Sequence, residues 1–477
     1  MSANGKPEGA YPSMMGLSYK VLKGAEKGKS PLLSGADWAP GCDSGVYDRV
    51  AQIIGDLEKG GEEKALDYAQ KLDNWPAEKK TLLLTASEIE KQVAVLSESA
   101  RNDIAVQMDR IRKFAVAQMS HMNSFEMELS PGVYTGQKIV PLNAAGCYVP
   151  GGRYSHISSA AMTVATAKAA GVKHVVAASP PMRGTTTIHP ATLYAMHLAG
   201  ADSVLVCGGA HAIGSLAFGL FTGAPADIIV GPGNSFVAEA KRFLYGRVGI
   251  DMFAGPTEIL CLADSTGDAR ILATDLVSQA EHGPTSPAWF FTTCPELAEQ
   301  VEKLVPELIE ALPEGNPARE SWPDYGEIIL LPSRDDMRQL SDLYAAEHLE
   351  VHCKDDLDWW LSKLTNYGSL FLGEETCVSY GDKISGPNHA LPTLRASRYT
   401  GGLSVDKYVK KLTYQRMTRD ANRELGPLCA RISRMEGMEA HARAADERLA
   451  QWFPEEQFEL KPKMLTEEAE KEAAAAQ

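Results

Sequence analysis

The chain has 477 residues, of which 44% are hydrophobic and 23% charged, and its formal net charge is −15. These values are ordinary for a globular protein, and they exclude a wholly disordered chain, a fibrous repeat and a small disulfide scaffold. The negative charge argues against non-specific binding to nucleic acid or to an anionic membrane, because both need a positive field. The length allows roughly three domains and a large core.

The start of the chain and its cysteines indicate a cytoplasmic protein. The first residues, MSANGKPEGAYPSMMG, are polar and lack the apolar segment of a secretory signal. No run approaches the roughly 18 apolar residues that a membrane span needs. The eight cysteines are scattered singly without a CxxC pair, which is typical of buried thiols in a reducing compartment. We therefore expect structural cysteines rather than a cysteine-based zinc site.

Residues 1–34 are rich in glycine, proline, lysine and serine and are expected to form an N-terminal arm. Apolar residues at helical spacing predict helices within 47–61 and 100–119. Short apolar runs bounded by glycine or proline turns follow in the segments 138–152, 173–181, 203–210 and 227–234. Helical windows separate these runs, so we expect a parallel sheet built of βαβ units.

A second set of apolar runs, again alternating with helical windows, lies at 258–264, 288–293, 327–332 and 368–373. The two sets predict an α/β fold with two doubly wound, incomplete Rossmann-like modules, each binding its ligand at the carboxyl ends of its strands. Segments 404–420 and 429–453 are expected to form a helical C-terminal extension without strands. Residues 457–477 are charged and of low complexity, as in a solvated tail.

Three glycine-rich turns, GCYVPGG, CGGAHAIG and VGPGNS, each follow an apolar run and precede a helical window. Such turns bring backbone N–H groups and a helix N-terminus to a strand end, which suits an anion or a nucleotide. They also occur as ordinary βα loops. The motifs GxxxxGK[ST], HExxH and GxSxG are absent, and no GxGxxG follows the first strand.

Two pairs of side chains are candidates for chemistry. Gln279 and His282 lie three residues apart on one face of a predicted helix, where they could bind zinc or simply end an amphipathic helix. Glu347 and His348 form an acid–imidazole pair, expected at a helix end facing a cleft. The alternative for this pair is a surface carboxylate beside a packed histidine.

Further candidates lie in loops and in the C-terminal helical region. A loop rich in glycine and proline supplies an aspartate and a histidine, and the C-terminal helix supplies a glutamate and a histidine. Two more histidines lie in loops at strand ends. In chain order, these candidates are His156, His211, Asp382, His389, Glu436 and His441.

Five stretches of the chain occur in one order: VGPGNSFVAEAKRFLYGRVGIDMFAGPTE, SQAEHGP, AAEHLE, FLGEE with SYGDKISGPNHALPT, and EGMEAH. In this order they resemble the histidinol dehydrogenase family over roughly residues 40–455. The resemblance implies a homodimer that uses one zinc ion per subunit and NAD. It also implies oxidation of a primary alcohol through the aldehyde to the carboxylate, with two NAD consumed per turnover.

The resemblance also assigns roles to residues. His348 would take the alcohol proton while hydride leaves for the nicotinamide, and Glu347 would activate water on the aldehyde. The implied zinc ligands are Gln279, His282, Asp382 and the partner subunit's His441, and the partner would also supply Glu436. The implied substrate contacts are Thr257, His389 and Glu436, and the implied dinucleotide contacts are Tyr148, His211 and Asn234.

Three departures from the family pattern bear on the substrate. His211 replaces a glutamine, Thr257 replaces a serine, and Arg153 and His156 stand where small apolar residues are usual. An arginine and a histidine near the cleft suit a substrate with fixed negative charge, although a solvated loop is the alternative. The pattern is similar to the branch that contains sulfopropanediol 3-dehydrogenases. We expect such a sulfonated diol as substrate, with L-histidinol as the alternative and a non-catalytic binding protein as a distant third.

The resemblance also implies a function for each expected domain. The first module would be discontinuous and catalytic, comprising residues 35–147 and 258–403, and the second, 148–257, would bind NAD. Residues 404–456 would form a dimerisation extension, between the second part of the catalytic module and the tail.

Overall fold

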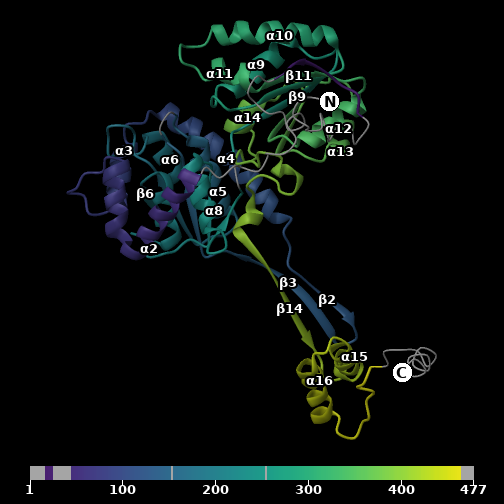
Figure 1. Cartoon of the computed structure of the whole chain (residues 1–477). Helices are drawn as coiled ribbons and strands as arrows, with labels where there is room; N and C mark the ends of the chain where they lie inside the picture. The colour runs from purple at the N-terminus through teal and green to yellow at the C-terminus, as the bar shows by residue number, and fades with distance from the viewer. Residues whose placement is uncertain (1–16, 25–43, 152–153, 253–254, 463–477) are drawn as a thin grey trace. The chain divides into compact units, whose positions relative to one another are not determined.

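The computed structural model describes residues 17–24, 44–151, 154–252 and 255–462. They fall into two compact units, one within Met1–His121 and Pro141–Val409 and the other within Met122–Val140 and Lys410–Gln477. The larger unit contains two sheets with helices around them (Figure 1). Among the described residues, no helix is long and apolar enough to cross a membrane.

The first sheet of the larger unit has five strands, all parallel to their neighbours. They are β4 (Ala144–Tyr148), β5 (His174–Ser179), β6 (Ser203–Val206), β7 (Ile228–Val230) and β8 (Gly249–Ile250). Their spatial order, β6-β5-β4-β7-β8, is the order of a Rossmann fold, which confirms the predicted class. The order reverses between β4 and β7, so a crevice is expected at the carboxyl ends of these two strands.

Helices from two parts of the chain cover this sheet. Those between its strands are α5 (Ile157–Ala169), α6 (Pro190–Ala199), α7 (Gly209–Phe218) and α8 (Ser235–Leu244), and those preceding it are α2 (Ser44–Leu72), α3 (Ala86–Val93) and α4 (Glu98–Ser120). Helix α2 packs on α7 and α8, whereas α4 packs on α5 and α6. The expected assignment of 35–147 to the other module therefore differs from the structure, because the apolar faces of these helices are buried against the five-stranded module.

The second sheet has six strands and repeats the same order. It comprises β9 (Ile259–Ala263), β10 (Ala288–Thr292), β11 (Gly326–Leu330), β12 (His348–Val351), β13 (Ser369–Leu372) and the edge strand β1 (Lys20–Lys23). The parallel strands run β11-β10-β9-β12-β13, and β1 pairs antiparallel with β11. The two modules thus share one topology, and the order of this sheet reverses between β9 and β12.

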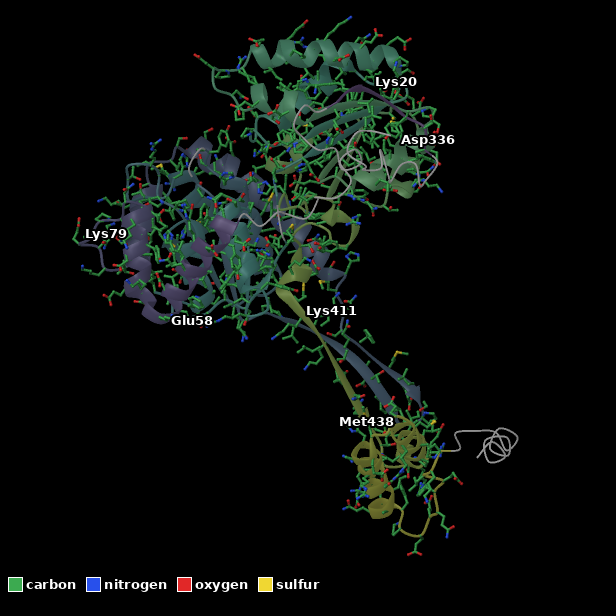
Figure 2. The ribbon with its side chains drawn as sticks, in the orientation of Figure 1. Lys20, Glu58, Lys79, Asp336, Lys411 and Met438 are labelled. Atoms are coloured by element: carbon green, nitrogen blue, oxygen red, sulfur yellow. The ribbon has the colours of Figure 1, made fainter. Side chains whose placement is uncertain are left out.

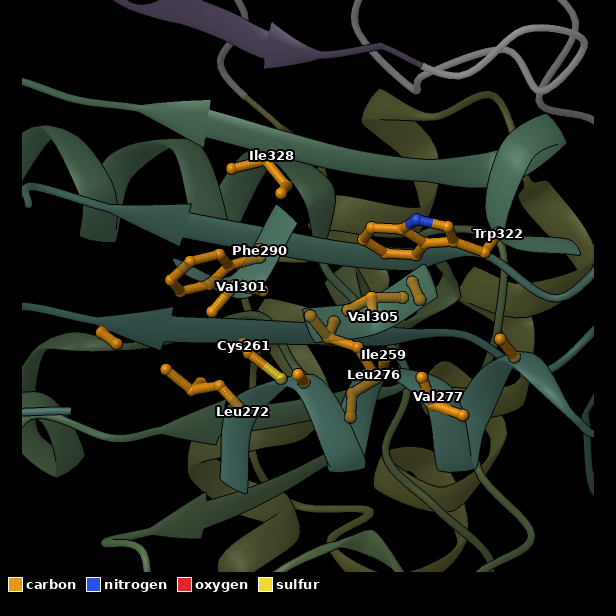
Figure 3. Close-up of a cluster of buried hydrophobic side chains, with 14 of the residues drawn as sticks. Ile259, Cys261, Leu272, Leu276, Val277, Phe290, Val301, Val305, Trp322 and Ile328 are labelled. Carbon is orange, nitrogen blue, oxygen red and sulfur yellow. The ribbon is translucent and has the colours of Figure 1, made fainter. Parts of the chain in front are cut away.

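Two apolar layers sandwich the six-stranded sheet. One packs Cys261 and Phe290 against α9 (Ala269–Ala280), α10 (Pro295–Glu310) and α11 (Ala318–Tyr325), as Figure 3 shows. The other packs Leu260 and Trp289 against α12 (Arg334–Tyr344) and α13 (Leu357–Lys363). Both faces are covered, which explains why these strands read as continuous apolar runs. Helix α14 (Val378–Lys383) follows the last strand.

The smaller unit combines strands and helices. Its sheet has the order β14-β3-β2, with β2 (Phe125–Ser130), β3 (Val133–Pro141) and β14 (Val409–Met417), and its helices are α15 (Ala421–Met435) and α16 (Glu439–Trp452). The prediction of a helix over 404–420 was wrong, because Val405–Tyr408 is a short 3-10 turn followed by β14. All residues of β14 after Val409 are exposed, so burial does not mark this strand, and pairing with the distant β3 decides for it.

Candidate active site

A cavity of about 760 Å³ lies within the larger unit and is lined by both α/β modules. The five-stranded module contributes the segment that follows β4 and a residue that follows β7. The six-stranded module contributes residues that precede β9, follow α9 and begin β12. Of the predicted site residues, the cavity is lined by His156, Thr257, His282, Glu347, His348, Asp382 and His389. Residues that are distant in sequence are therefore gathered at one place, as the motifs required.

The two sheets present opposite ends to this cavity. Tyr154 and Pro232 follow β4 and β7, so the five-stranded sheet contributes its carboxyl edge, as expected. Thr257 precedes β9 and His348 begins β12, so the six-stranded sheet contributes its amino edge. The expectation that both modules bind ligand at their carboxyl ends is therefore wrong for the site in the second sheet.

The buried ring of His348 is held in one tautomer. Its Nδ1 lies 3.0 Å from the carbonyl oxygen of Glu258, which can only accept a hydrogen bond. Nδ1 therefore carries the hydrogen, and Nε2 keeps its lone pair. Among the described residues, Nε2 has no hydrogen-bond partner, although it is buried. The imidazole is thus oriented as a general base with a free nitrogen at the cavity.

The carboxyl group of Glu347 is fixed beside this ring. One oxygen accepts hydrogen bonds from Oγ1 of Thr257 at 2.5 Å and from the backbone nitrogen of Glu258 at 2.9 Å. Burial raises the pKa of Glu347 to about 7, so the group can gain or lose a proton near neutral pH. The pair was expected at a helix end, but His348 begins strand β12, because pairing with β9 extends the chain here.

Gln279 has an amide oxygen that the protein does not satisfy. The amide nitrogen donates to Oγ1 of Thr257 at 2.8 Å, and the side chain is only 1% exposed. Among the described residues, the amide oxygen has no hydrogen-bond partner. A buried acceptor without a partner is costly, and a bound cation would satisfy it. The donor set at this end of α9 therefore fits a metal ion.

His282 and Asp382 present a nitrogen and an oxygen to the same cavity. Burial lowers the pKa of His282, which keeps the ring neutral and able to coordinate. Burial disfavours ionisation of Asp382, but the hydrogen bond and charge of His389 and the charge of His348 outweigh it and hold its pKa well below the usual range. A neutral imidazole and an ionised carboxylate are the forms that zinc requires.

His156 lies where the cavity meets the start of α5, as its N-cap residue. Burial, with smaller contributions from the positive charges of His389 and Lys383, lowers its pKa to about 4, although the charge of Asp382 acts in the opposite direction. The basic side chains of His389 and Lys383 and the carboxylate of Asp382 therefore lie on this side of the cavity. An anionic ligand would raise the pKa of His156, because it would offset the repulsion between these groups. Arg153, the other residue proposed for an anionic substrate, lies outside the described residues.

The predicted dinucleotide residues lie at the carboxyl edge of the five-stranded sheet. The hydroxyl of Tyr148 accepts from the backbone nitrogen of Gly209 at 3.1 Å, and Asn234 caps α8 through its side-chain oxygen. His211 is 1% exposed, and its Nε2 lies 2.9 Å from a carboxylate oxygen of Asp73. The other ring nitrogen of His211, Nδ1, is buried and has no hydrogen-bond partner among the described residues. The side chains of Tyr148 and Asn234 hold the turns in place.

Two predicted site residues belong to the smaller unit. Glu436 ends α15 and His441 lies in the first turns of α16, and both side chains are exposed. The motif EGMEAH is therefore at the surface of that unit, at the junction of its two helices.

Sequence reasoning missed two residues that shape the site. The backbone of Glu258 orients both members of the Glu347–His348 pair, and burial raises the pKa of its own side chain to about 8. Oγ of Ser159 lies 2.8 Å from Nε2 of His389. Glu258 directly follows Thr257 in the GPTE segment, which could have drawn attention to it. Ser159 lies in a helix of small residues and carried no such signal.

Comparison with known proteins identifies relatives over most of the chain. The family model of histidinol dehydrogenase matches residues 41–449. Sulfopropanediol 3-dehydrogenase of Ruegeria pomeroyi is 54% identical over 419 residues, which are 87% of this chain and 95% of that protein. Histidinol dehydrogenase of Zymomonas mobilis subsp. mobilis is 39% identical over 400 residues, 84% of this chain and 92% of that protein.

A solved structure shows the same relationship in three dimensions. Histidinol dehydrogenase from Elizabethkingia anophelis matches with a TM-score of 0.80 and 31% identity, over 90% of this chain and 94% of that chain. The matches span both α/β modules and the smaller unit, and they confirm the resemblance that the ordered motifs indicated. The chain belongs to the histidinol dehydrogenase family of oxidoreductases.

Proposed function

We propose that this protein is a zinc- and NAD-dependent dehydrogenase that oxidises a small polar primary alcohol through the aldehyde to the carboxylate. One observation carries the proposal. The unpartnered Nε2 of His348 and the carboxyl of Glu347, with its pKa of about 7, line one cavity of the described structure. A free imidazole nitrogen and a carboxyl group with a pKa of about 7 suit two successive oxidations, because each oxidation needs a proton removed from an oxygen.

The proposed zinc ligands are Gln279, His282, Asp382 and the partner subunit's His441. The buried amide oxygen of Gln279 and the burial-lowered pKa of His282 support this choice. When bound, zinc would polarise the substrate oxygen.

The protein's own side chains would move the protons. In the first oxidation, Nε2 of His348 accepts the hydroxyl proton while Nδ1 remains bonded to Glu258. In the second, Glu347 accepts a proton from the water that adds to the aldehyde, and Thr257 holds its carboxylate in place. Hydride passes to NAD in each oxidation, so two NAD are reduced for each alcohol consumed.

We propose the five-stranded module as the NAD-binding part. Its Rossmann strand order supports this, as does a second cavity of about 260 Å³ at the carboxyl ends of β4 and β5. Tyr154 and Ser155 line both this cavity and the larger one, so a ligand could extend from one to the other. Tyr148, His211 and Asn234 remain the proposed dinucleotide residues.

We propose that the smaller unit forms the homodimer interface. On β2, Phe125, Met127 and Leu129 are at least half exposed. On α15, Leu428, Ile432 and Met435 form an exposed apolar stripe at helical spacing, and Met438, labelled in Figure 2, extends it. A concentration of apolar surface in so small a unit is typical of an interface. His441 and Glu436 would then reach the partner's site.

For the substrate, we propose a sulfonated diol of the sulfopropanediol type, and L-histidinol is the second candidate. The 54% identity to a sulfopropanediol 3-dehydrogenase and the positive groups around His156 favour the former. The matches to histidinol dehydrogenases at about 40% identity support L-histidinol as the second candidate.

A panel of alcohols tests the proposal. Purified protein with zinc and NAD should oxidise sulfopropanediol with a higher kcat/KM than L-histidinol or an uncharged diol, and should form two NADH per alcohol. Arg153→Ala should lower kcat/KM for the sulfonate by roughly tenfold or more, the value of one charge-assisted hydrogen bond, and leave L-histidinol unaffected. Lack of turnover with every alcohol would contradict the proposal, whereas preference for L-histidinol would overturn only the substrate.

A further inference from the structure

A second group of metal-binding side chains lies beneath the six-stranded sheet, away from the cavity. Cys261 on β9 and Glu350 on β12 are paired in register, so their side chains lie side by side on one face. His352 follows two residues later, directly after the end of β12. Cys261, Glu350 and His352 are fully buried, and one ligand atom of each lies within 4.8 Å of the others.

The group is separate from the proposed active site. His348 begins β12 at the amino edge, and four residues of extended chain to His352 span about 13 Å. The group therefore lies toward the carboxyl edge, between β9 and β12, where the strand order reverses. Doubly wound sheets bind ligands at this point. In this sheet the position is filled by a thiol, a carboxyl group and an imidazole.

The spacing of the atoms resembles the edges of a zinc tetrahedron. Oε2 of Glu350 lies 3.1 Å from Nε2 of His352 and 3.6 Å from Sγ of Cys261. Zinc bond lengths and tetrahedral angles give about 3.3 Å for a nitrogen–oxygen edge and about 3.5 Å for a sulfur–oxygen edge. Oδ2 of Asp275, from α9, lies 3.9 Å from the same nitrogen of His352. It has no hydrogen-bond partner among the described residues, although it is buried.

Electrostatics also favours a cation here. Glu350 and Asp275 direct carboxylate oxygens at the same imidazole nitrogen in an environment shielded from water. Two carboxylates held this close repel each other unless a proton or a cation lies between them. Glu350 is fully buried and the side chain of Asp275 is only 13% exposed, so solvent relieves little of that repulsion.

We propose that Cys261, Glu350, His352 and Asp275 bind a second zinc ion with a structural role. Thiolate, imidazole and carboxylate together suit zinc better than magnesium or calcium, which prefer oxygen alone. Binding would release the thiol proton of Cys261 and the proton shared by the two carboxyl groups, and no electron is transferred. Four protein ligands leave no open position, which is typical of a structural rather than a catalytic site.

A zinc ion at this second site would hold in place the two helices, α9 and α14, that carry proposed ligands of the zinc ion in the cavity. Asp275 lies on α9, which ends near Gln279. Oε1 of Glu350 accepts a hydrogen bond from the backbone nitrogen of Val378, the first residue of α14, at 2.8 Å. Asp382 lies near the other end of α14. A metal at this point would join two strands to both helices and so stabilise the arrangement of the cavity.

The number of zinc ions per subunit, measured in wild type and in variants, distinguishes a failure of the second zinc site from a failure of the proposed function. Wild-type protein freed of loosely bound metal should contain two zinc ions per subunit by elemental analysis and native mass spectrometry. Cys261→Ser and His282→Ala should each retain one, because each removes a ligand from a different site. Cys353→Ser is the matched control: Cys353 is equally buried but packs in the layer on the other face of the sheet, and this variant should retain two.

Cobalt substitution provides a readout that does not depend on stoichiometry. A thiolate ligand gives cobalt(II) a near-ultraviolet charge-transfer absorption, and the proposed cavity ligands include no thiolate. The band should appear in wild type, Cys353→Ser and His282→Ala, and be absent from Cys261→Ser. If Cys261→Ser does not fold, the band in His282→Ala still decides. A wild type that contains only one zinc per subunit, with none left in His282→Ala, would overturn the second site and leave the proposed function standing. The absence of a thiolate band in wild type would do the same. Two zinc ions in His282→Ala would contradict the cavity site instead.

Discussion

The backbone carbonyl of Glu258 fixes the tautomer of His348, by accepting a hydrogen bond from Nδ1 at 3.0 Å. The same residue donates its backbone N–H to the carboxylate of Glu347 at 2.9 Å. One peptide segment at the start of β9 therefore orients both acid–base groups of the proposed reaction. Neighbouring parallel strands bring it there, because β9 and β12 pair in register from their first residues.

Removing the free nitrogen of His348 should lower turnover by orders of magnitude without unfolding the protein. The substitution His348→Asn retains an N–H group that can reach the carbonyl of Glu258 but has no equivalent of Nε2. Loss of a general base lowers kcat by about 10²- to 10⁴-fold. NADH formation and the melting temperature, measured together, check this expectation. His197→Ala, at an exposed position on α6, serves as control. Near-normal turnover in His348→Asn would remove His348 from the mechanism.

Replacing Glu347 should separate the two oxidations. Glu347→Gln keeps an oxygen that can accept from Thr257 and from the backbone of Glu258, but it cannot take a proton from water. We expect aldehyde to accumulate and the yield to fall from two NADH per alcohol toward one. Trapping the aldehyde and counting NADH measure the ratio. An unchanged ratio, equal to that of the exposed control Glu302→Gln, would exclude Glu347 as the base of the second step.

The buried carboxyl of Glu258 should make stability fall as pH rises. Its pKa is raised by burial from 4.5 to about 8, so between these values the folded state binds its proton more tightly than the unfolded state. The stabilising contribution is complete below about pH 4.5 and is lost as pH rises toward about 8. The slope for one such group reaches about 1.4 kcal/mol per pH unit.

The variant Glu258→Gln tests this dependence because an amide does not titrate in this range. Urea midpoints of wild type and variant, compared at about pH 6 and about pH 8, should converge at the higher pH. The test depends on how the difference between the two urea midpoints changes with pH. The amide adds a cost of its own in a buried site, but this cost is the same at both pH values. A difference that is independent of pH would show that Glu258 is not protonated in the folded protein.

Mixed dimers should reveal which subunit supplies His441. His348→Ala and His441→Ala should each be inactive alone. If the partner contributes His441, a heterodimer of the two variants contains one site with both histidines intact. Random mixing of the two chains should then restore up to about a quarter of wild-type activity. No recovery in verified heterodimers would mean that each site uses its own His441.

The sequence by itself determined the fold class and most of the cavity. Alternating apolar runs and helical windows predict parallel sheets because strands buried on both faces must be apolar throughout. The ordered motifs predicted that Gln279, His282 and Asp382 would come together with Glu347 and His348. All of these except Gln279 line one cavity, and Gln279 donates a hydrogen bond to Thr257, which also lines it. Such signals are local, since they depend on residue types within one turn or one strand.

Tertiary structure decided what local signals could not. Segment 404–420 forms β14 because β3, far away in the chain, offers it backbone hydrogen bonds. Glu347 and His348 lie at a strand start because β9 pairs there, and the cleft uses the amino edge of that sheet. The isolated Cys261, expected to be only a packing residue, lies beside Glu350 because two strands align in register. Strand pairing joins residues that are far apart in sequence, and no local pattern records which strands become neighbours.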